Sequence, residues 1–246
     1  MSKNKKKINY QNEENNSYSG KGLLFAVEKN LFNLNKVIVR NLSKNLGDNK
    51  LVLDFGAGIG TLAKIWFHEK KVLPECVEID IALREILIKR KFIAYSSIHE
   101  SRKKYDVIYS SNVLEHIDDD FSAIKQMHFK LKKNGFLCIF VPAFNFLYSD
   151  LDKNIGHYRR YNIKGMTEKL KLANFDIKEA YYFDSIGFFI WWLYLKVFKL
   201  KLTNDQSSNN HLLFYDKFIM PLSIFLDRLG FKFLFGKNLI VIAKKK

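Results

Sequence analysis

The chain has few cysteines and no apolar segment of membrane-spanning length in its most aromatic region. Both shortages limit the classes of protein to which it can belong. Its 246 residues include two cysteines, Cys76 and Cys138, each in an apolar stretch typical of a strand. Such positions predict small core side chains and give no basis for a disulfide framework or a zinc site. The uncharged aromatic run 186–195 stops at Lys196. This run is too short for a helix that spans a membrane.

The amino-terminal stretch lacks the apolar core that a signal peptide needs. Residues 1–19 are polar and rich in Lys, Asn and Glu. We therefore expect residues 1–20 to form a disordered tail, and we expect a cytoplasmic protein.

Arginine is also scarce, although the chain is strongly basic. The formal net charge is +16, and seven of the 41 basic residues are Arg while 34 are Lys. Such a charge is typical of proteins that bind nucleic acid or an anionic membrane. The lysines are spread along the whole chain, so we interpret most of them as a solvated surface and expect no nucleic-acid partner.

Strand and helix patterns alternate along the chain. The expected strands are 51–55, 75–79, 92–95, 105–110, 136–141, 175–183 and 238–243. The expected helices are 21–46, 61–71, 81–91, 119–132 (stopped by Asn134-Gly135), 164–173 and 211–229. Repeated strand–helix–strand units predict an α/β fold with a mainly parallel sheet and helices on both faces. Ligands in such sheets bind outside the carboxyl ends of the strands.

Three glycines follow the first expected strand at alternate positions. Asp54 lies near the end of that strand, and a helix begins at Thr61, with Gly56, Gly58 and Gly60 between them. Glycines there let the backbone approach a ligand, and the helix start offers free N–H groups. A dinucleotide-binding loop would need glycine where this chain has Thr61. The pattern instead resembles motif I of class I S-adenosylmethionine-dependent methyltransferases.

That resemblance implies a Rossmann-like, seven-stranded sheet with S-adenosyl-L-methionine as cofactor. The core would be residues 21–184, followed by a helical insertion, 185–236, and by the last strand and a basic tail, 237–246. Asp80, at the expected end of the second strand, suits the ribose hydroxyls. Glu78 on the same strand is a rival, and Asp80 is also a helix N-cap candidate.

The segment after the fourth expected strand resembles a second methyltransferase motif, in which "LEH" follows the strand. Ser111 and Asn112 match the positions beside the methionine end of the cofactor. His116 is a candidate general base because imidazole titrates near neutrality. Glu115 and His116 are equally compatible with a structural role in the loop. Relatives that bind magnesium here carry Glu at the position of Asn112, so we expect no metal.

The run Gly156-His157-Tyr158-Arg159-Arg160-Tyr161 resembles a bacterial methyltransferase group found beside glycosyltransferases for surface polysaccharides. The family places an acceptor-facing loop there, which makes His157 a candidate base. It makes Arg159, Arg160 and Tyr161 candidate acceptor-binding residues, because guanidinium groups suit phosphate or carboxylate. A structural alternative pairs one arginine with Asp150 or Asp152. The chain lacks the family's acid after the third strand, so a serine or backbone group within 95–98 would hold the adenine.

The insertion has two interpretations. Its aromatic and Lys-rich helices resemble an interfacial pair lying on a membrane, with peripheral contact through 186–202 at the inner face. They are equally compatible with a helical cap that buries its aromatics against the sheet.

Three functions remain open from the sequence. The first is methyl transfer to an oxygen of a small molecule or glycan, including a lipid-linked sugar. The second is nucleic-acid methylation, which net charge alone supports. The third is a non-catalytic interaction protein that retains the fold, against which the intact Asp54, Gly56, Gly58 and Asp80 argue.

Overall fold

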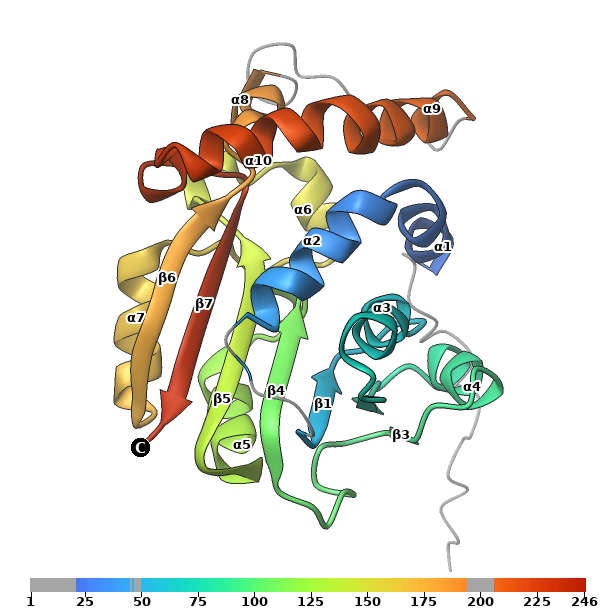
Figure 1. Cartoon of the computed structure of the whole chain (residues 1–246), viewed down its shortest axis with the longest axis vertical. Helices are drawn as coiled ribbons and strands as arrows, with labels where there is room; N and C mark the ends of the chain where they lie inside the picture. The colour runs from blue at the N-terminus through green and yellow to red at the C-terminus, as the bar shows by residue number, and fades with distance from the viewer. Residues whose placement is uncertain (1–20, 45, 47–49, 194–205) are drawn as a thin grey trace, which may run out of the picture.

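A seven-stranded sheet forms the centre of the molecule (Figure 1). The computed structural model describes residues 21–44, 46, 50–193 and 206–246. The strand order is β3-β2-β1-β4-β5-β7-β6, and β7 runs antiparallel to both of its neighbours. The strands are β1 (Val52–Phe55), β2 (Glu75–Val77), β3 (Ala94–Tyr95), β4 (Tyr105–Ser111), β5 (Leu131–Pro142), β6 (Phe175–Phe183) and β7 (Asn238–Lys245). The expected seven-stranded α/β fold is confirmed.

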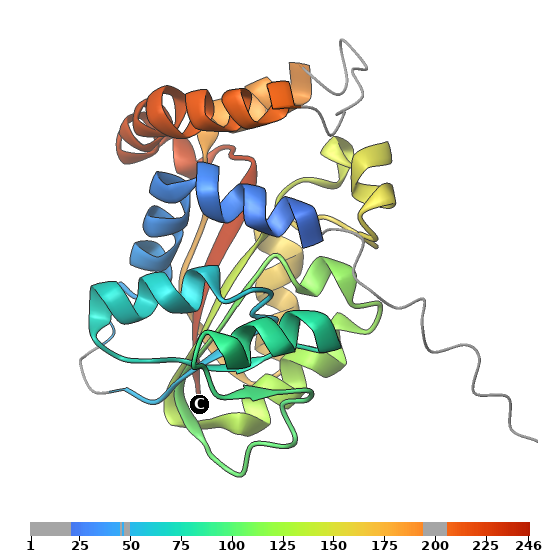
Figure 2. The same ribbon diagram turned by 90° about the vertical axis from the view of Figure 1, so that its right-hand side faces the viewer.

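Helices cover both faces of this sheet (Figure 2). On one face lie α2 (Phe32–Leu42) and α3 (Thr61–Lys70), whose Val39 and Trp66 pack on β1, β4 and β5. On the other face lie α5 (Asp120–Lys130) and α7 (Ile163–Leu172). The remaining helices before β6 are α1 (Lys21–Asn30), α4 (Ile81–Lys89) and the short α6 (Asp150–Asn154).

The expected helix 21–46 is divided in two at Leu31. The backbone amides of Asn33 and Leu34, in the first turn of α2, donate to the carboxylate of Asp216 at 2.9 and 2.8 Å. A side chain more than 180 residues away therefore satisfies the free N–H groups of α2. Local sequence carries no signal for that contact.

Further element boundaries differ from expectation. The helix α5 ends at Lys130, not near Asn134-Gly135, because Leu131 already pairs with Tyr105 in the sheet. The extra residues before Phe136 form a bulge in β5. The strand β2 ends at Val77, so the prediction that Asp80 ends this strand is wrong.

The expected helical insertion lies between β6 and β7. It contains α8 (Ser185–Trp192), α9 (Gln206–Phe214), the π-helical turn η4 (Tyr215–Ile219), α10 (Met220–Arg228) and the short η5 (Phe231–Phe233). The expected tail 1–20 and much of the segment 186–202 lie outside the described residues. None of the helices that the structure describes is long and apolar enough to cross a membrane.

Candidate active site

The glycine loop after β1 is shaped by backbone conformation and close packing. Gly56, Gly58 and Gly60 have φ values of +82°, +55° and +82°, which other residues rarely adopt. The amide of Gly56 donates to the Val77 carbonyl at 2.9 Å, which holds the loop against β2. A Cβ at Gly56 would strike the side chain of Val113, so the loop leaves no room for a larger residue there.

Asp54 lies directly beneath this loop in a buried position. The hydroxyl of Tyr109 donates to its Oδ2 at 2.8 Å, and Tyr109 stacks on Trp66. Burial raises the pKa of Asp54 to about 7, the Tyr109 hydrogen bond opposes the rise, and the nearby Glu78 adds to it. The side chain is therefore about half ionised at neutral pH, and a positive group beside it would favour the carboxylate.

Glu78, not Asp80, contacts the glycine loop. Its Oε2 accepts the backbone N–H of Gly58 at 2.7 Å, and its Oε1 accepts the N–H of Asp80 at 3.0 Å. Burial raises the pKa of Glu78, although these backbone hydrogen bonds oppose it. Asp80 is the N-cap of α4, where its Oδ1 accepts the N–H of Leu83 at 2.9 Å. The short β2 thus brings Glu78 to the loop and Asp80 to the start of α4.

The helix α1 covers the outer side of the glycine loop. A Cβ at Gly58 would lie 3.4 Å from the Leu24 side chain, in ordinary van der Waals contact. Glu28 pairs with Arg90 at 2.7 and 2.8 Å, and Arg90 also donates to the Ile59 carbonyl at 2.8 Å. This ion pair fixes α1 over the loop, and sequence analysis did not identify it.

The loop after β4 presents the expected Ser111 and Asn112 at the carboxyl edge of the sheet. Ser111 is the last residue of β4, and Asn112 is exposed with φ of +52°. The amide of Asn112 donates to the Phe140 carbonyl at 2.8 Å, which anchors the loop to β5. A short 3₁₀ helix, Leu114–His116, follows and carries Glu115 and His116.

Glu115 is fully buried, and neither carboxylate oxygen has a hydrogen-bond partner outside its own residue among the parts of the chain described. Burial raises its pKa to about 8, which its own backbone and Arg160 oppose. At neutral pH the side chain is therefore largely an uncharged carboxylic acid.

Asp152 holds the expected acceptor loop in place. Its Oδ1 lies 2.8 Å from Nδ1 of His157, and the Arg160 guanidinium donates to both oxygens at 2.9 and 3.1 Å. Asp152 also forms a capping box with Ser149 at the start of α6. Burial alone would raise the pKa of Asp152, but the hydrogen bonds from His157, Arg160 and Ser149 and the charge of Arg160 lower it to about 2.

The three expected acceptor-binding residues have different surroundings. Arg160 is buried against Asp152, which matches the structural alternative of the sequence analysis. Tyr161 is also buried, and its hydroxyl donates to Asp120 at 2.8 Å. Arg159 is partly exposed and pairs with Asp118 at 3.2 Å and Asp120 at 3.3 Å. Of the three, Arg159 is the one with surface available to an acceptor.

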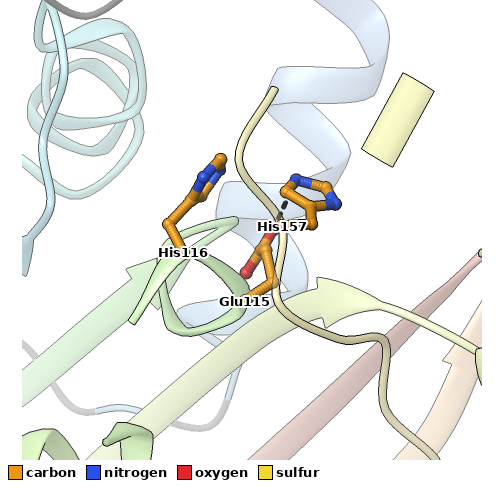
Figure 3. A group of neighbouring side chains, drawn as sticks. All are labelled: Glu115, His116 and His157. Carbon is orange, nitrogen blue, oxygen red and sulfur yellow. Dashed lines mark ion pairs between the residues drawn. The ribbon is translucent and has the colours of Figure 1, made fainter. Parts of the chain in front are cut away.

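The structure brings both expected bases together (Figure 3). The rings of His116 and His157 lie edge to face with centroids 4.5 Å apart, and Nε2 of His157 lies 3.9 Å from Oε1 of Glu115. Burial and the neighbouring His157 lower the pKa of His116 to about 4. One ligand atom from each of Glu115, His116 and His157 lies within 4.8 Å of the others, a donor set that also suits a divalent metal. The expectation of no metal stays a prediction.

Comparisons with known proteins identify a family and similar folds. A family described as methyltransferase domain matches residues 27–180. An S-adenosylmethionine-dependent methyltransferase from Archaeoglobus fulgidus is 21% identical, with a TM-score of 0.59 over 91% of this chain and 99% of that one. Phosphoethanolamine N-methyltransferase 2 from Haemonchus contortus, in complex with S-adenosyl-L-methionine, is 18% identical, with a TM-score of 0.60 over 92% of this chain and 57% of that enzyme.

A third solved structure is the Haloferax volcanii complex between a methyltransferase activator and a methyltransferase. It is 11% identical, with a TM-score of 0.61 over 91% of this chain and 93% of that one. At such identities the likeness to these structures concerns the fold. A search of curated proteins finds no match to this chain.

Proposed function

Because the chain belongs to the methyltransferase domain family, we propose that it transfers a methyl group from S-adenosyl-L-methionine (SAM) to a hydroxyl oxygen of a small-molecule or glycan acceptor. The observation that carries this proposal is the Asp152–His157 pair, which lies beside His116 at the edge where ligands of such sheets bind. An ionised carboxylate that orients an imidazole is the arrangement of a general base.

The residues around the glycine loop fit SAM. Three of the five loop residues 56–60 are glycines, and Glu78 at the side of the loop is a carboxylate suited to the two ribose hydroxyls. In this proposal Asp54, Ser111 and Asn112 would hold the methionine end. Asp80, the candidate from sequence, supports the same region by capping α4. When bound, SAM supplies a methyl group on a positively charged sulfur, which needs no further activation.

His157 is the base in this proposal. Ionised Asp152 accepts the N–H of its Nδ1, which leaves Nε2 to take the acceptor's hydroxyl proton and stabilises the imidazolium that results. His116, whose pKa is lowered to about 4, stays neutral and acts as an orienting hydrogen-bond partner. The chain otherwise contributes alignment and exclusion of water.

The acceptor would contact the exposed part of the same loop. Tyr158 follows His157 and is 58% exposed, which offers an aromatic face to a sugar ring. Arg159 lies next to it and offers a guanidinium to a phosphate or carboxylate on the acceptor. Arg160 and Tyr161 act from inside by holding the loop.

The test has two steps. Calorimetry with SAM measures cofactor binding, and methyl-labelled SAM with fractionated cell-envelope precursors then measures transfer. Label in a glycan fraction that disappears in His157→Gln supports the proposal. Equal transfer by wild type and by His157→Gln and Arg159→Ala would contradict the assigned base and acceptor contact.

A further inference from the structure

The helical segment 206–235 has its apolar and polar faces reversed relative to an ordinary surface helix. The helices α9, η4 and α10 follow one another without a break along the carboxyl edge of the sheet (Figure 1). Its inward positions, spaced by four, three and four residues, are Asp216, Met220, Ser223 and Asp227. Its outward positions, each more than half exposed, are Phe214, Phe218, Leu222, Phe225 and Leu229. Folding of this chain buries the three polar residues among the inward positions, which we call the polar stripe, beside Met220 and leaves the outward apolar stripe in water.

Specific partners hold the polar stripe inward. Asp216 caps α2, as described above, and Asp227 accepts the amide of Asp184 at 2.9 Å. Ser223 donates to Asp184 at 2.8 Å. Because these contacts satisfy buried polar groups, rotating the helix to bury its aromatics would leave them unpaired. The outward direction of the apolar stripe is therefore a fixed property of the fold.

The apolar surface continues beyond this helix. Phe231, Phe233 and Leu234, after α10, are exposed, and so are Phe189 and Trp192 on α8, which packs against α10. We call the outward residues of 206–235 the apolar face. Its exposed apolar side chains form a continuous group, whereas protein surfaces ordinarily carry such side chains singly.

The exposed charged side chains within 206–235 are positive. The acidic residues of 206–235 are Asp216 and Asp227, and both are buried, whereas Lys217 and Arg228 are exposed. Lys217 lies 5.4 Å from the Phe218 ring, and Lys232 lies 5.2 Å from the Phe233 ring. With a net charge of +16, two copies of the chain would repel each other, so the complementary occupant is anionic.

We propose that the apolar face docks on an anionic lipid bilayer, with the helix lying in the plane of the headgroups. Aromatic and aliphatic side chains flanked by cations are the composition of an interfacial helix. The site differs from the contact expected at 186–202, and it stands independently of the acceptor assigned above. Ring contacts from Phe235 through Phe188 to Phe146 connect this region to the loop that precedes His157. A bilayer on the apolar face would thus lie near the proposed acceptor loop.

The experiment is flotation of the full chain with vesicles of phosphatidylcholine alone or mixed with phosphatidylglycerol. The test variant is Phe218→Gln/Leu222→Gln/Phe225→Gln, and the matched control is Ile88→Gln/Phe129→Gln/Leu172→Gln, whose three residues are also more than half exposed but lie elsewhere. We expect binding to the anionic vesicles, an at least tenfold loss in the test variant and no loss in the control. Lys217→Gln/Lys232→Gln should weaken binding and reduce its dependence on salt.

Recovery of the wild type in the vesicle-free fraction would overturn the proposal, and so would equal binding by the test and control variants. Sedimentation that shows a wild-type dimer, disrupted in the test variant, would assign the face to a second copy instead. Calorimetry with SAM on the same variants tests folding and cofactor binding independently of vesicle binding. Lost flotation with intact SAM binding therefore contradicts neither the fold nor the proposed activity.

Discussion

The carboxylate of Asp152 lies 2.8 Å from Nδ1 of His157 and simultaneously binds the buried guanidinium of Arg160. One acid therefore orients the proposed base and fixes the loop that carries it. Asp152 belongs to the short helix α6, for which sequence analysis predicted no element.

His157→Gln should lower methyl transfer by roughly 10²–10⁴-fold, the usual contribution of a general base. SAM affinity should stay within twofold of wild type, because His157 lies outside the glycine loop. Single-turnover kinetics across pH are the measurement. The exposed His99→Gln is the matched control and should leave the rate unchanged. Loss of SAM binding together with activity in His157→Gln would argue for a structural role.

Substitution of Arg159 should weaken acceptor binding, whereas substitution of Arg160 should lower the stability of the fold. Arg160→Ala leaves Asp152 buried with fewer partners, and we expect a loss of about 3–5 kcal/mol in the free energy of unfolding. Arg159→Ala removes a partly exposed pair and should cost no more than about 1 kcal/mol. Chemical denaturation and the KM for the acceptor are the two measurements. We expect a raised KM in Arg159→Ala with nearly unchanged stability. A larger loss of stability in Arg159→Ala than in Arg160→Ala would contradict this geometry.

Glu115 should make the protein less stable as pH rises. Its pKa is raised to about 8 in the folded state from an ordinary 4.5, so the folded state holds a proton that unfolding releases between these values. Its favourable contribution is complete below pH 4.5 and is lost as pH rises through about 8. Glu115→Gln keeps the shape without the titration. The stability of this variant relative to wild type should therefore increase by a few kcal/mol from pH 5 to pH 8.5, and a flat difference would contradict the buried, uncharged state.

Gly56→Ala should abolish SAM binding, because the new Cβ would meet Val113 and the residue has φ of +82°. Gly165→Ala in α7 is the control. That glycine has no positive φ, so alanine should stabilise the helix slightly, by up to about 1 kcal/mol. Calorimetry with SAM and thermal unfolding of both variants check the pair. Normal affinity in Gly56→Ala would place the cofactor elsewhere.

The sequence predicts correctly those element boundaries that depend on neighbouring residues alone. The strand β6 has the expected bounds, because Asn174 and Asp184 interrupt an otherwise continuous strand pattern with positive φ values. The break at Leu31 depends on Asp216, a partner more than 180 residues away that local sequence does not reveal. The pairing of Arg160 with Asp152 was one of the alternatives that the sequence left open, and the structure decides between them. The helix expected at 211–229 was found, but its periodicity cannot tell which stripe faces inward. Here the buried hydrogen-bond partners of the polar stripe decide the direction.

The most direct test of the central claim is a calorimetric titration of SAM into wild type, Glu78→Ala and Asp80→Ala. We expect one site in the wild type and at least tenfold weaker binding in Glu78→Ala, whose carboxylate borders the glycine loop. Asp80→Ala should bind SAM within a few-fold of wild type and lose about 0.5–2 kcal/mol of stability, because it loses the cap of α4. Absence of SAM binding by the folded wild type would contradict the assignment of this chain as a SAM-dependent enzyme.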